Sequence, residues 1–111
     1  MEQRFDLARQ LGQDIHQQAH ELFKDNKGIQ EGVTYPSLNS YQEDWNKITP
    51  ILKEALNQLS DEELEKRIEM GPDFSMSLYE LITFVSYREA NIIGQIALWR
   101  RLLGYPAMRY M

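Results

Sequence analysis

The last third of the chain decides the fold: residues 77–104 read SLYELITFVSYREANIIGQIALWRRLLG, a stretch without proline. Ser77, followed three residues later by Glu80, is a capping box that predicts a helix start, and Gly104 predicts its end near Leu103. The main apolar stripe recurs at helical spacing along Leu78, Leu81, Val85, Arg88, Ile92, Gln95, Trp99 and Leu102. Because the other faces are also largely apolar, the helix must be buried on several sides. Either it is central to the chain's own fold or a second chain covers the rest, and we favour the second chain.

The N-terminal sequence predicts a first helix over residues 2–24. Its apolar residues at helical spacing are Ala8, Leu11, Ile15, Ala19 and Leu22. Gly12 lies within this pattern and weakens the prediction slightly. Residues 25–37 contain two glycines and a proline, so they are typical of a loop.

A second helix is predicted over residues 38–59, where one apolar stripe continues without a break. Pro50 lies inside it, which favours one kinked helix, with two helices meeting near Thr49 as the alternative. Ser60 and the acidic residues after it predict a short helix that ends near Gly71. The sequence therefore predicts an all-α protein with three main helices, one short helix and no strands.

Composition predicts one small domain over residues 1–111. The chain has no cysteine, which excludes disulfides, thiolate nucleophiles and cysteine-ligated metals. No apolar run reaches the roughly 20 residues that a membrane span needs, and the polar N-terminus is unlike a signal peptide. We therefore expect a cytoplasmic protein without a membrane partner.

The charge distribution argues against a nucleic-acid partner. The net charge is −5; residues 1–87 hold 8 basic and 16 acidic side chains, and residues 88–111 hold 4 basic and 1 acidic. Affinity for a phosphate backbone rises with the number of cationic contacts. Four arginines beside an acidic surface are better explained as cations that suit the C-terminal end of a helix.

Polar residues interrupt the apolar stripe of the last helix. A buried Arg88 would need acceptors around it, because a guanidinium does not deprotonate in proteins. It could form an ion pair with Glu89 or with an acid on the first helix, or extend outward to solvent. Alternatively, a bundle pocket lined by Tyr87, Arg88, Gln95 and Trp99 could bind a small molecule.

His16 and His20 are four residues apart and would share one face of the first helix. Two histidines at this spacing can hold one metal ion, and Glu21 or Glu89 could supply a third ligand. The sequence HQQAH lacks the glutamate of the zinc-protease motif, however. Two solvated histidines on an outer helix face are the alternative.

Residues 77–108 resemble the last helix of the DinB-like (YfiT-like) metalloenzyme family. That family's segment His-Glu-x-x-His-x-Gly-Gln-Ile corresponds to residues 88–96, REANIIGQI, and its Arg-Leu-Leu-Gly end to residues 101–104. Supporting similarities are YPSL (35–38), the helix around Trp45 and LNQLSDEEL (56–64). The resemblance covers roughly residues 20–111.

The resemblance implies an up-and-down bundle of four helices, often dimeric, with a divalent metal held by three histidines. Some members are thiol-dependent S-transferases or isomerases. In this chain the two ligand positions on the last helix are Arg88 and Ile92, which cannot bind Zn²⁺ or Ni²⁺ as histidine does. Residues 4–12 are similar to the later part of the family's second helix, so the first helix and the remaining histidine would be absent.

We therefore expect a shortened DinB-like bundle with a degenerate metal site and no cofactor. We expect homodimerisation to complete it, through the two last helices or through the last helix and the second helix. Its expected function is that of a non-catalytic binding or assembly module. The alternative is a metal-dependent hydrolase or thiol S-transferase with a relocated Zn²⁺ or Ni²⁺ site on His16 and His20.

Overall fold

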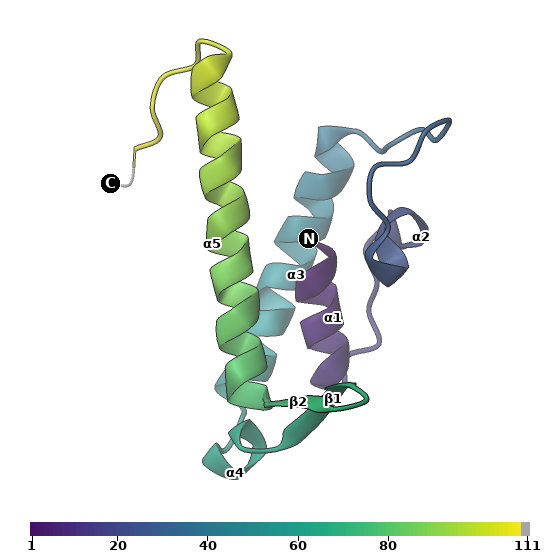
Figure 1. Cartoon of the computed structure of the whole chain (residues 1–111), viewed down its shortest axis with the longest axis vertical. Coiled ribbons are helices and arrows are strands. Elements are labelled where there is room, and N and C mark those ends of the chain that lie inside the picture. The colour runs from purple at the N-terminus through teal and green to yellow at the C-terminus, as the bar shows by residue number, and fades with distance from the viewer. Residues whose placement is uncertain (110–111) are drawn as a thin grey trace. The chain divides into compact units, whose positions relative to one another are not determined.

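The computed structural model describes residues 1–109 (Figure 1). The chain divides into two compact units, with the boundary between Asp61 and Glu62. The protein is about 60% helical and also contains a two-stranded antiparallel sheet. The prediction of an all-α bundle without strands is therefore wrong, because a hairpin replaces part of the predicted short helix. The prediction of one domain over residues 1–111 stays a prediction.

The first helix of the first unit is much shorter than predicted. Helix α1 spans Glu2–Gln10, and the continuous helix over residues 2–24 is wrong. Gly12 lies just beyond the helix with φ of +89°, and the N–H of Gln13 donates to the carbonyl of Ala8 at 3.0 Å. A glycine in this left-handed conformation ends a helix, since other residues adopt it only with strain.

The rest of the first unit contains two short helical turns and one long helix. Helix α2 spans His20–Phe23, the 3₁₀ turn η1 spans Lys24–Asn26, and helix α3 spans Leu38–Asn57. Residues 27–37 are irregular, as predicted. Helix α3 continues through Pro50, so the prediction of one helix is confirmed and the alternative of two helices is not.

The buried side chains of the first unit lie mainly on α1 and α3, which pack against each other. Phe5 on α1 and Ile48 on α3 are fully buried. Polar contacts link the same pair of helices: the Arg4 guanidinium lies 3.6 Å from the Trp45 ring centroid and donates to the Thr49 hydroxyl at 2.9 Å. Packing and a cation–π contact thus join the two helices.

The second unit contains a hairpin where sequence predicts a helix. Helix α4 (Asp61–Leu64) is one turn long, and strands β1 (Arg67–Gly71) and β2 (Phe74–Ser77) follow. The short helix predicted from Ser60 to near Gly71 is therefore wrong beyond Leu64. Proline and aspartate at positions 72 and 73 favour a turn, and a bulge before Gly71 adjusts the register of the strands.

Side chains close the outer edge of β2. The backbone N–H of Leu78 donates to Lys66 at 2.9 Å, so by antiparallel alternation the carbonyl of Ser75 points away from β1. Arg67 Nη2 donates to that carbonyl at 2.7 Å, and the outward N–H of Ser77 donates to the Glu80 carboxylate at 2.7 Å. Two outward backbone groups of β2 are therefore satisfied by side chains.

Helix α5 spans Leu78–Leu102, as predicted (Figure 1). The capping box is present, because the N–H of Glu80 also donates to the Ser77 hydroxyl at 3.1 Å. The hydrogen bond from the Ser77 N–H, aided by nearby Arg67, holds the pKa of Glu80 below its ordinary value. Gly104, with φ of +89°, follows the C-terminal end of the helix, as predicted.

Most large side chains of α5 are exposed. Leu78 and Leu81, in the first turn, are buried. Beyond them the exposed large hydrophobic residues on the helix are Phe84, Tyr87, Ile92, Ile93, Ile96, Leu98, Trp99 and Leu102. The expectation that a second chain covers part of this helix stays a prediction.

Candidate functional site

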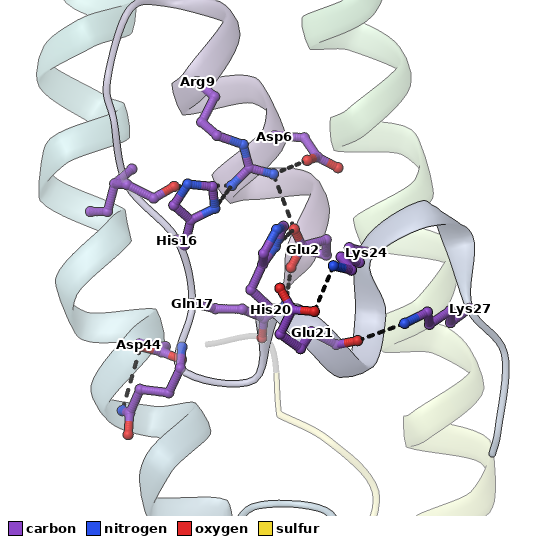
Figure 2. Close-up of polar contacts among 12 residues, drawn as sticks. Glu2, Asp6, Arg9, His16, Gln17, His20, Glu21, Lys24, Lys27 and Asp44 are labelled. Atoms are coloured by element: carbon purple, nitrogen blue, oxygen red, sulfur yellow. Dashed lines mark hydrogen bonds and ion pairs between the residues drawn. The ribbon is translucent and has the colours of Figure 1, made fainter.

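A polar cluster in the first unit gathers around the Glu2 carboxylate, which is drawn with its partners in Figure 2. Glu2 accepts hydrogen bonds from Arg9 Nη2 at 3.0 Å, from His20 Nδ1 at 2.7 Å and from the side-chain amide of Gln17. Burial raises the pKa of Glu2, but the three hydrogen bonds outweigh it, so the net pKa lies below its ordinary value. Glu2 is therefore a charged anchor that fixes residues 17 and 20 beside α1.

The Arg9 guanidinium contacts several further groups of the cluster. Besides Glu2, its guanidinium contacts Asp6 on the same helix. It also donates to the backbone carbonyl of Ile15 at 3.0 Å and to His16 Nδ1 at 3.1 Å. The end of α1 is thereby tied to the irregular segment that follows Gly12 (Figure 2).

The neighbours of the two histidines define their tautomers. An arginine can only donate, so His16 Nδ1 accepts and its proton lies on Nε2; a carboxylate only accepts, so His20 donates from Nδ1 to Glu2. The two rings lie 4.5 Å apart between centroids, although they do not share a helix face. The contacts to Arg9 and Glu2 therefore occupy the Nδ1 atoms of both histidines.

A cavity of about 280 Å³ opens beside the cluster, lined among others by Glu2, Asp6, His20 and Phe23. The two cations at its wall are already engaged, because Arg9 is bound by Glu2 and Asp6 and Lys24 is paired with Glu21. Residues 1–109 contain no group of three His, Asp or Glu side chains placed to hold a metal. A Zn²⁺ or Ni²⁺ site on His16 and His20 stays a prediction.

Asp44 fixes the irregular segment to α3. Its side chain is buried and accepts a hydrogen bond from the backbone N–H of Gln18 at 2.8 Å. The neighbouring Gln17 is also buried, and its amide orientation follows from its donation to Glu2. Its carbonyl oxygen has no hydrogen-bond partner among the described residues. The segment is thus held by side-chain contacts at both ends instead of by a helix.

The residues predicted to line a pocket on the last helix are solvent-exposed on α5. Tyr87 and Trp99 are 66% and 64% exposed. Gln95 donates to the Asn91 side chain at 2.7 Å, and the Arg88 guanidinium lies 5.8 Å from the Phe84 ring centroid. Tyr87 and Arg88 are consecutive and project about 100° apart, so the four residues do not share one face.

Five residues of the cluster were not predicted from sequence, namely Glu2, Asp6, Arg9, Gln17 and Asp44. One signal was present: Glu2, Asp6 and Arg9 recur at helical spacing, and acid–arginine pairs at three or four residues are stabilising. The contacts of Gln17 and Asp44 join segments distant in the sequence, so spacing within one helix gives no signal for them.

Comparison with known proteins gives no matching family model, no matching curated protein and no matching solved structure. The resemblance to the DinB-like family over residues 20–111 therefore stays a prediction. No helix within residues 1–109 combines the length and apolar character needed to cross a bilayer.

Proposed function

We propose that this protein is a non-catalytic assembly module that forms a homodimer through α5. The observation that carries the proposal is the exposure of the large apolar side chains that follow Leu81 on this helix. Contiguous apolar surface on a protein is a common mark of an interface. A cytoplasmic location and the absence of a bound cofactor belong to the same proposal.

The faces of α5 differ in a way that supports an interface on one of them. One face carries the exposed Ile92 and Trp99. The opposite face carries the small residues Thr83, Ala90, Gly94 and Ala97 together with Arg101, and the exposed Tyr87 and Leu98 lie beside it. Large side chains supply most of the apolar area that an interface buries, so the first face is the one that we assign to the partner.

The test places a charge on each face in turn. We expect Ile92→Glu to convert the dimer to a monomer, because a carboxylate would be buried without a partner. Ala90→Glu adds the same charge on the small-residue face and should leave the dimer intact. Light scattering coupled to size exclusion measures the mass, and circular dichroism checks that helix content is kept. A monomeric wild-type protein, or a dimer unaffected by Ile92→Glu, would contradict the proposal.

A metal-dependent hydrolase or S-transferase is the second candidate function, favoured by the 4.5 Å separation of the two histidine rings. It requires the Arg9 contact to His16 to break, since that contact occupies Nδ1 and leaves the proton on Nε2. Stoichiometric Zn²⁺ or Ni²⁺ that is lost when His16 and His20 are both changed to Ala would support this function over the assembly module.

A further inference from the structure

We draw no further inference here: the strongest candidate, the cavity of about 280 Å³ beside α1 and α2 in the first unit, belongs to the polar cluster already described, in which Arg9 binds the carboxylates of both Glu2 and Asp6 at its wall.

Discussion

At the scale of single residues, the side chains of Glu2 and Arg9 form hydrogen bonds that hold the residues after α1. In a longer first helix, backbone hydrogen bonds would hold these residues. Once Gly12 ends α1, the next residues need other partners, and these come from side chains: Arg9 for Ile15 and His16, Glu2 for Gln17 and His20. Charge-assisted hydrogen bonds are stronger than neutral ones, which suits a segment without regular structure.

The first prediction concerns Glu2 and pH. Because the pKa of Glu2 is lowered in the folded protein, its stabilising effect is present above the ordinary value of 4.5 and is lost as pH falls through the lowered value. Glu2→Gln should therefore lower the free energy of unfolding by about 1–3 kcal/mol at neutral pH, with the difference from wild type narrowing in acid. Urea unfolding at several pH values measures this.

A matched control for that experiment is Glu31→Gln in the exposed loop. It removes the same charge away from the cluster and should change the free energy of unfolding little at any pH. An equal, pH-independent loss in both variants would contradict the role given to Glu2.

At the scale of elements, α3 and α5 could be predicted from sequence, whereas α1 and the hairpin could not. The first two carry long apolar stripes with serine caps, and local signals of this kind fix a helix. The apolar spacing continues on both sides of Gly12, which predicts too long a first helix, whereas the capping signal at Ser60 predicts a helix where β1 forms. Ala19, for example, is buried although it lies in an irregular segment. The spacing of apolar residues therefore cannot distinguish such a segment from a helix.

The polar cluster around Glu2 could not be predicted from sequence, because most of its contacts join segments that are distant along the chain. The acids and the arginine on α1 signal ion pairs within that helix, but Gln17, His20 and Asp44 reach it only after the chain has folded back. His16 and His20 do lie together, although the reason is a tight irregular segment instead of a shared helix face.

Pro50 gives the second prediction, at the scale of one helix. It lies exposed inside α3 and lacks the N–H that would bond to the carbonyl of Asn46. Pro50→Ala should raise the free energy of unfolding by about 2 kcal/mol, since the gain in helix propensity exceeds the freedom returned to the unfolded chain. Lys53→Ala, one turn on, should have a much smaller effect in the same urea titration.

At the scale of the whole molecule, the proposed homodimer predicts that stability depends on protein concentration. A dimer that dissociates on unfolding is stabilised by mass action, so a tenfold rise in concentration should raise Tm by about 3 °C. Ile92→Glu should remove this dependence while Ala90→Glu keeps it. Calorimetric scans at two concentrations measure the shift, and a wild-type Tm that does not change with concentration would count against the dimer.

The side chains along the outer edge of β2 bear on aggregation. A two-stranded sheet has open edges, and an open edge is a template on which another molecule's strand can add. Arg67 occupies the outward carbonyl of Ser75, and Glu80 occupies the outward N–H of Ser77. The same capping box that starts α5 therefore also occupies an outward backbone N–H at this edge of β2.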